Sequence, residues 1–131
     1  MNIHEAKKTG MKQTPVLSTG VETIASAVLT VPTKGEGFID ITAQVAQFLQ
    51  QTGGTTGAIS LFIRHTSASL TIQENADPDV LADLLTSLRR LAPADGGWRH
   101  TVEGPDDMPA HIKTMLTSVS LQIPVLDGAL A

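Results

Sequence analysis

The alternation of apolar and polar positions predicts several β-strands. Alternation is clearest in residues 57–65, where one face carries aliphatic side chains and ends in an imidazole, and in residues 118–125. Residues 70–74 repeat the arrangement and end in a carboxylate, so we expect them to form a hairpin with residues 57–65. Two weaker segments, residues 23–31 and 38–41, are also predicted as strands from their β-branched content and their turn-forming neighbours.

Three helices are predicted from apolar spacing and end signals. Apolar side chains recur at i, i+4, i+7 and i+8 from Ile41, and Gly53-Gly54 ends that helix. Asp77-Pro78 combines an N-cap residue with a proline in the first turn, and Pro93 bounds the helix that follows. Asp106-Asp107 offers a cap for a third, shorter helix. The order of elements predicts an α+β fold with a mainly antiparallel sheet.

Composition narrows the class of protein. The 131 residues include three Phe, one Trp and no Tyr, so we expect other subunits to supply part of the burial. The net charge of −4 argues against a nucleic-acid partner, and eight of the thirteen acidic residues lie between Glu74 and Asp107. The chain has no cysteine and no apolar run near the roughly 20 residues of a membrane span. A soluble cytoplasmic protein without a membrane partner is expected.

Three histidines, His65, His100 and His111, lie in runs rich in carboxylates and amides, which suggests one composite site. His65 and Glu74 would be neighbours at the rim of the predicted hairpin. The turn at Gly104-Pro105 would bring His100 and His111 together, although their spacing matches no standard zinc motif. Purely structural roles for each histidine remain an alternative.

Other polar residues are candidates for supporting roles. One of the two acids at 106 and 107 can cap the helix while the other, Asp107, faces the site as a ligand, a partner of a histidine, or a base. The hydroxyls of Thr66 and Ser67 could bind phosphate oxygens, or satisfy their own backbone instead. Asn75 could receive an anion, and Arg99 is one of few cations near the histidines. Nucleotide-binding glycine loops and serine-hydrolase motifs are absent from the sequence.

At these residues the chain resembles the YjbQ family, also described as secondary thiamine-phosphate synthases. The resemblance rests on His65-Thr66-Ser67-Ala68 and the later run Glu74-Asn75-Ala76-Asp77-Pro78-Asp79-Val80. It rests equally on His100 followed by Glu103-Gly104-Pro105-Asp106-Asp107-Met108-Pro109-Ala110-His111-Ile112-Lys113, and on Ile123-Pro124-Val125-Leu126-Asp127-Gly128. It implies an α+β fold with a β-sandwich and three helices, assembled as a homotrimer. Residues 1–13 are expected to be a mobile lead-in, and residues 14–131 a single YjbQ-like domain. The family usually continues into a Gly-Thr-Trp-Gln-Gly segment and a closing strand, which this sequence does not contain.

The resemblance also implies a reaction, the joining of a pyrimidine methyl diphosphate to a thiazole phosphate, with a small phosphorylated heterocycle as substrate. That chemistry needs a divalent cation, zinc or magnesium, to neutralise the leaving diphosphate. The predicted ligands are His65, His100 and His111, with His65, Glu74, Asn75 and Asp107 as catalytic candidates and Thr66, Ser67 and Arg99 as binding candidates. Alternatives are a metal-dependent hydrolase of a small phosphoester or amide, a non-catalytic ligand-binding trimer, and a metal-free anion site.

Overall fold

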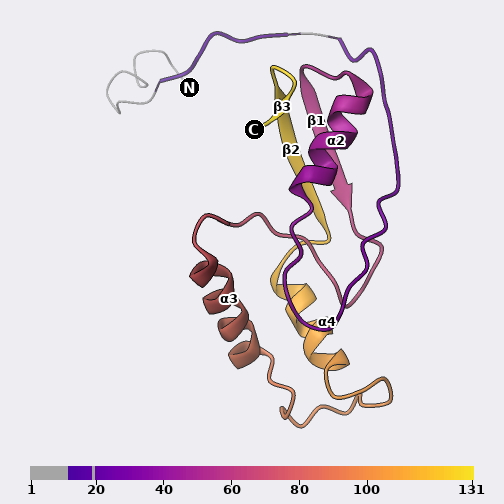
Figure 1. Cartoon of the computed structure of the whole chain (residues 1–131), viewed down its shortest axis with the longest axis vertical. Coiled ribbons are helices and arrows are strands. Elements are labelled where there is room, and N and C mark those ends of the chain that lie inside the picture. The colour runs from indigo at the N-terminus through magenta and orange to yellow at the C-terminus, as the bar shows by residue number, and fades with distance from the viewer. Residues whose placement is uncertain (1–11, 19) are drawn as a thin grey trace.

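The computed structural model describes residues 12–18 and 20–131, and its elements fall in two groups along the long axis (Figure 1). One group is a three-stranded sheet with a single helix, and the other is a pair of helices joined by long loops. In chain order the elements are α2 (Thr42–Thr52), β1 (Gly57–Phe62), α3 (Pro78–Leu91), α4 (Asp107–Leu116), β2 (Ser120–Leu126) and β3 (Ala129–Leu130). The predicted α+β fold with three helices and an antiparallel sheet is confirmed.

The helix ends follow the local sequence. Asp77 precedes α3, and its side chain accepts a hydrogen bond of 2.9 Å from the backbone N–H of Asp79, while Pro78 occupies the first turn. Gly53 ends α2 in the left-handed conformation, with its N–H bonded to the carbonyl of Gln50. Both boundaries lie where the sequence predicts them.

The sheet has the order β1-β2-β3, with antiparallel pairing throughout. Gly57 of β1 lies opposite Val125 of β2, and Phe62 lies opposite Ser120. Val45 and Leu49 of α2 pack against Ile59 and Val125 to form the core cluster. Each of these side chains contributes about 1.5–3 kcal/mol when fully buried, so α2 holds one face of the sheet.

The predicted hairpin between residues 57–65 and 70–74 is wrong. β1 pairs instead with β2, and the segment 70–74 takes part only in an isolated bridge between Leu70 and Ser118. The apolar alternation is longer in β2 than in residues 70–74. Six residues of β2 lie opposite β1, whereas residues 70–74 could supply five at most. His65 and Glu74 therefore do not face each other across a ladder.

The strands predicted over residues 23–31 and 38–41 are also wrong. Both segments are without regular secondary structure, because no neighbouring strand of the described chain lies beside them to complete a ladder. Ile24 and Val28 are 91% and 75% exposed, so the apolar alternation that suggested a strand has nothing to pack against. The predicted lead-in, residues 1–13, falls mostly outside the described residues. Across residues 12–18 and 20–131, no helix combines the length and apolar character needed to cross a bilayer.

Glu36 ties the loop before α2 to both helices of the other group. Its carboxylate accepts a hydrogen bond of 2.8 Å from Nε of Arg89 on α3 and another from Nζ of Lys113 on α4. These contacts with Lys113 and then Arg89 hold the pKa of Glu36 below its usual value. The loop therefore fixes the relative position of the two helices.

We expect Glu36→Gln to lower the free energy of unfolding at neutral pH by up to about 1 kcal/mol, the usual range for a partly exposed ion pair. A carboxyl whose pKa is depressed by folding stabilises the native state above its unfolded pKa, and this contribution disappears as the pH falls through the folded pKa. The difference between the two proteins should therefore vanish in acid. Urea denaturation at a series of pH values measures it, with Glu22→Gln as the exposed control. A loss that persists unchanged in acid would contradict the electrostatic explanation.

Candidate metal centre

The first turns of α4 place a carboxylate and an imidazole side by side. Asp107 and His111 are four residues apart, so their side chains lie on the same face of the helix. Pro109 sits in the first turn, where its missing N–H costs no helical hydrogen bond. Asp106 occupies the N-cap position without a side-chain cap bond, and Asp107 points into the site.

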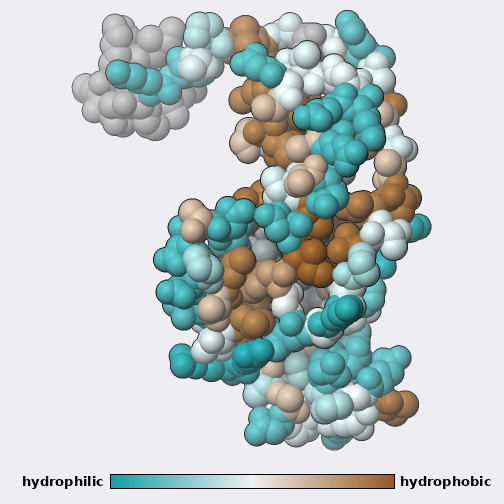
Figure 2. All heavy atoms as spheres, in the orientation of Figure 1, coloured by the Kyte–Doolittle hydropathy of each residue, from teal (hydrophilic) through white to brown (hydrophobic). Residues whose placement is uncertain are grey.

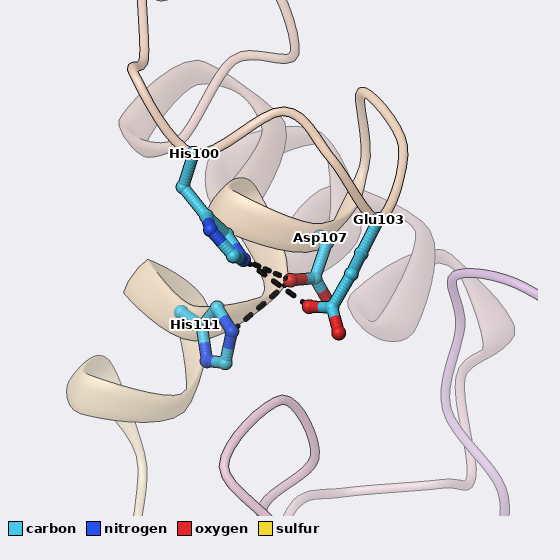
Figure 3. Close-up of side chains that lie close together, drawn as sticks. All are labelled: His100, Glu103, Asp107 and His111. Carbon is cyan, nitrogen blue, oxygen red and sulfur yellow. Dashed lines mark hydrogen bonds and ion pairs between the residues drawn. The ribbon is translucent and has the colours of Figure 1, made fainter.

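The loop before α4 supplies two more groups. The N–H of Gly104 donates to the carbonyl of Thr101 at 3.2 Å, which closes a tight turn. Gly104 has a φ of +111°, and a Cβ at this position would lie 3.0 Å from Oδ1 of Asp106, so the turn requires glycine. This turn brings His100 and Glu103 back over the start of α4 (Figure 3).

The four side chains His100, Glu103, Asp107 and His111 converge on a small volume (Figure 3). Nε2 of His100 lies 2.8 Å from Oδ2 of Asp107 and 3.2 Å from Oε2 of Glu103. Nε2 of His111 lies 3.1 Å from the same Oδ2 of Asp107. One ligand atom from each residue falls within 4.8 Å of all the others, so a single ion could contact all four.

A backbone carbonyl determines which ring nitrogen of His111 carries the proton in the neutral imidazole. Its Nδ1 lies 2.8 Å from the carbonyl oxygen of Thr66, which can only accept a hydrogen bond, so Nδ1 carries a proton. In the neutral ring Nε2 then presents a lone pair toward the carboxylate of Asp107. A cation bound between Nε2 and this carboxylate would interact favourably with both.

The electrostatics of the site keep its acid ionised and its exposed imidazole basic. The hydrogen bond from His100, together with the histidine charges, holds the pKa of Asp107 below its usual value. The same contact with Asp107, aided by Glu103, raises the pKa of His100 above that of a free imidazole. The carboxylate is therefore ready to bind a cation near neutral pH, and at His100 protons compete with a cation from a higher pH than at a free imidazole.

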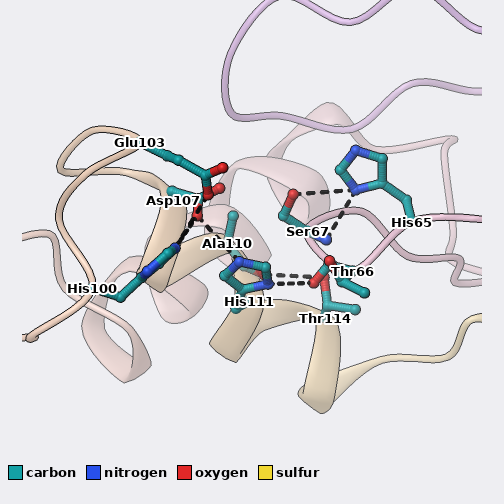
Figure 4. A network of polar contacts seen from close by, with 9 residues as sticks. All are labelled: His65, Thr66, Ser67, His100, Glu103, Asp107, Ala110, His111 and Thr114. Carbon is teal, nitrogen blue, oxygen red and sulfur yellow. Dashed lines mark hydrogen bonds and ion pairs between the residues drawn. The ribbon is translucent and has the colours of Figure 1, made fainter.

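His65 lies beside this cluster but does not join it (Figure 4). Its Nδ1 accepts a hydrogen bond of 2.9 Å from the backbone N–H of Ser67 and lies 3.1 Å from Ser67 Oγ. The residue between them, Thr66, contributes its carbonyl to His111 rather than its hydroxyl. The His65-Thr66-Ser67 run therefore acts by fixing the orientation of another imidazole.

Three other candidates are not among the four converging residues. The side-chain amide of Asn75 donates to Oδ2 of Asp40 at 3.1 Å, which ties it to the loop before α2. Glu74 and Arg99 are exposed side chains. None of the three belongs to the group of metal-competent side chains that the described residues form.

No role was predicted for Glu103 from the sequence. The signal was present, because Glu103 lies three residues after His100 and directly before the glycine turn that folds the loop back. The hydrogen bond between His111 and the Thr66 carbonyl could not be predicted from the sequence, because every residue type carries the same backbone oxygen.

The chain belongs to the family described as UPF0047 protein YjbQ-like, whose model matches residues 27–131. The UPF0047 protein sll1880 of Synechocystis is 47% identical over 104 residues, which cover 79% of this chain and 71% of that protein.

Two solved structures show the same fold. A conserved hypothetical protein of Thermus thermophilus superposes with a TM-score of 0.68 at 42% identity, covering 77% of this chain and 76% of that one. An uncharacterized YjbQ/UPF0047 family protein of Clostridium acetobutylicum gives a TM-score of 0.65 at 42% identity, covering 70% of this chain and 69% of that one.

These relatives correct the predicted reaction. They are described as UPF0047, hypothetical or uncharacterized proteins, and nothing about them indicates thiamine-phosphate synthase activity. The prediction of that transferase activity is therefore wrong.

Proposed function

We propose that this chain is a zinc-binding protein whose ion is held by His100, Asp107 and His111. The observation that carries the proposal is the hydrogen bond from Nδ1 of His111 to the Thr66 carbonyl. Metal-binding histidines commonly donate their second ring N–H to a carbonyl or carboxylate, which fixes the ring and makes the other nitrogen a better ligand. That other nitrogen of His111 faces Asp107.

The spacing of the donor atoms supports the same assignment. A tetrahedral zinc ion with bonds of about 2.0–2.1 Å separates its ligand atoms by roughly 3.3 Å. Here the two imidazole nitrogens lie 2.8 and 3.1 Å from the shared carboxylate oxygen of Asp107. Outward movements of a few tenths of an ångström would bring these two separations to the value expected around the ion.

The nature of the ligands favours zinc over magnesium. Two imidazoles suit zinc and similar transition metals, whereas magnesium prefers oxygen ligands in octahedral geometry. Glu103 exposes 67% of its side chain, and its Oε2 lies 3.2 Å from Nε2 of His100. We assign Glu103 the role of a hydrogen-bond partner for a water molecule on the ion. Three protein ligands then hold the zinc, as in zinc sites that keep an open position.

Calorimetric titration of chelator-treated protein with Zn²⁺ and with Mg²⁺ tests the proposal. One zinc ion per chain should bind, and magnesium should compete weakly even in large excess. An absence of zinc binding, or equal affinity for both ions, would contradict the assignment.

Zinc affinity should fall as the solution becomes more acid. Zinc needs the neutral imidazole, and the contact with Asp107 raises the pKa of His100, so protons compete from a higher pH than they would at a free histidine. Below that pKa the apparent affinity should drop about tenfold per pH unit for each proton displaced. Titrations across the neutral and mildly acid range measure the slope, and a flat profile would exclude His100 as a ligand.

The same chain, we propose, assembles as a homotrimer in which neighbouring copies complete the β-sandwich. Large apolar side chains of the described residues are exposed, among them Ile24 at 91% and Val28 at 75%. On the sheet face away from α2, Phe62 is 69% exposed, and apolar side chains also reach the surface midway along the molecule (Figure 2). Large exposed apolar area of this kind marks a protein–protein contact.

A further inference from the structure

A hollow of about 330 Å³ borders the proposed zinc site and shares His100 with it. The loop that runs from α3 to α4 forms its wall, with apolar surface from Ala94, Trp98 and Pro105 and polar groups from Asp95 and Thr101. This volume is at the small end of the range for ligand pockets, about 300–1,000 Å³, so it suits a molecule of one ring.

The indole of Trp98 is held in place before any ligand arrives. Its Nε1–H donates to the carbonyl of Pro93 at 2.8 Å, which closes the loop on itself. Gly96 lies against the ring, because a Cβ there would come within 2.3 Å of the indole. A half-buried indole with its N–H already bonded offers its remaining surface for stacking.

Charge determines which end of a ligand faces the ion. Asp95, Glu103 and Asp107 make the surroundings acidic, so an anionic group is repelled unless a cation lies between His100 and Asp107. The Asp95 carboxylate on the wall of the hollow disfavours a second negative charge on the ring. The best fit is a flat ring that is otherwise neutral and carries one carboxylate.

We propose that this hollow is the binding site for a small aromatic carboxylate, whose carboxylate binds the ion beside His100 while its ring stacks on Trp98. The inference rests on the zinc site proposed above. It adds a chemical class of ligand and a residue, Trp98, that lies outside the metal ligands.

The single tryptophan of the chain makes the proposal directly measurable, because intrinsic fluorescence reports only from this hollow. Benzoate is titrated into zinc-loaded and into chelator-treated protein, while calorimetry records zinc binding separately. We expect a saturable change in Trp98 fluorescence with zinc present, and at least about tenfold weaker binding without it. Cyclohexanecarboxylate tests the need for a flat ring and benzylamine tests the need for an anion, and both should bind at least about tenfold more weakly than benzoate.

Ala94→Leu adds bulk to the wall of the hollow at a position that is not a metal ligand, and it should abolish the benzoate response while leaving zinc binding intact. Val102→Leu places the same side chain on the same loop, at a 95% exposed position outside the hollow, and should leave both unchanged. Zinc binding without a benzoate response, an unaltered response in Ala94→Leu, or tighter binding of benzylamine overturns this inference but leaves the zinc site standing. Failure of zinc itself to bind overturns both. The three probe molecules test the native protein even if Ala94→Leu does not fold.

Discussion

Replacing His111 by alanine is expected to weaken zinc binding by more than about 100-fold. Loss of a residue that only orients a metal ligand typically costs 10–100-fold, and loss of the ligand itself should exceed that. His111 would supply one of two nitrogen ligands, and its ring is the one whose orientation is fixed by a backbone carbonyl. Competition against a chromophoric chelator measures the change.

His65→Ala is the matched control for this prediction. His65 belongs to the same segment of chain as the Thr66 carbonyl, but its imidazole is bonded to Ser67 and lies outside the cluster. Its replacement should change zinc affinity by less than about tenfold, through a small displacement of the Thr66 carbonyl. Equal losses in the two variants would mean that His65 is a ligand and that the site is assembled differently from the geometry described above.

Phe62→Asp is expected to convert the proposed trimer to monomers at micromolar concentration. Phe62 projects from the sheet face that α2 does not cover, and 69% of it is exposed in the single chain. Removing a buried phenyl ring at a subunit contact costs about 3 kcal/mol, roughly a 100-fold weaker association for each interface, and the buried charge adds to this. Sedimentation velocity of the variant and the native protein measures the change.

The control for charge and exposure is Val102→Asp. Val102 is 95% exposed on the loop before α4 and belongs to no strand, so an added carboxylate there should leave the proposed trimer intact. A native protein that sediments as a monomer would contradict the proposed assembly outright. A trimer that survives Phe62→Asp would move the interface to another apolar surface.

Local signals in the sequence predict the helices well and the strand pairing poorly. Asp77-Pro78 and Gly53 act on neighbouring backbone groups, so the ends they define need no knowledge of the rest of the fold. Pairing depends on which segments meet in space, and β1 pairs with β2, more than fifty residues away, in place of the nearer residues 70–74. The segment at residues 23–31 has strand-like alternation but no partner strand within the described chain.

The site was predictable to the extent that it depends on short-range geometry. Asp107 and His111 are one helical turn apart, and the glycine turn after Glu103 accounts for the return of His100. The sequence does not show that His65 lies outside the group of four converging side chains, or that the backbone of the next residue contacts His111. Asn75, Glu74 and Arg99 lie near the histidines in sequence, but sequence proximity does not bring long loops together in space.

We propose above all that one zinc ion binds between His100, Asp107 and His111. Anomalous diffraction at the zinc absorption edge, from crystals of untagged protein grown with zinc, tests it most directly. We expect one strong peak per chain, about 2.0–2.1 Å from Nε2 of each histidine and about 2.0–2.2 Å from the Asp107 carboxylate. A map without a peak at this position, or with its only peak on His65, would contradict it.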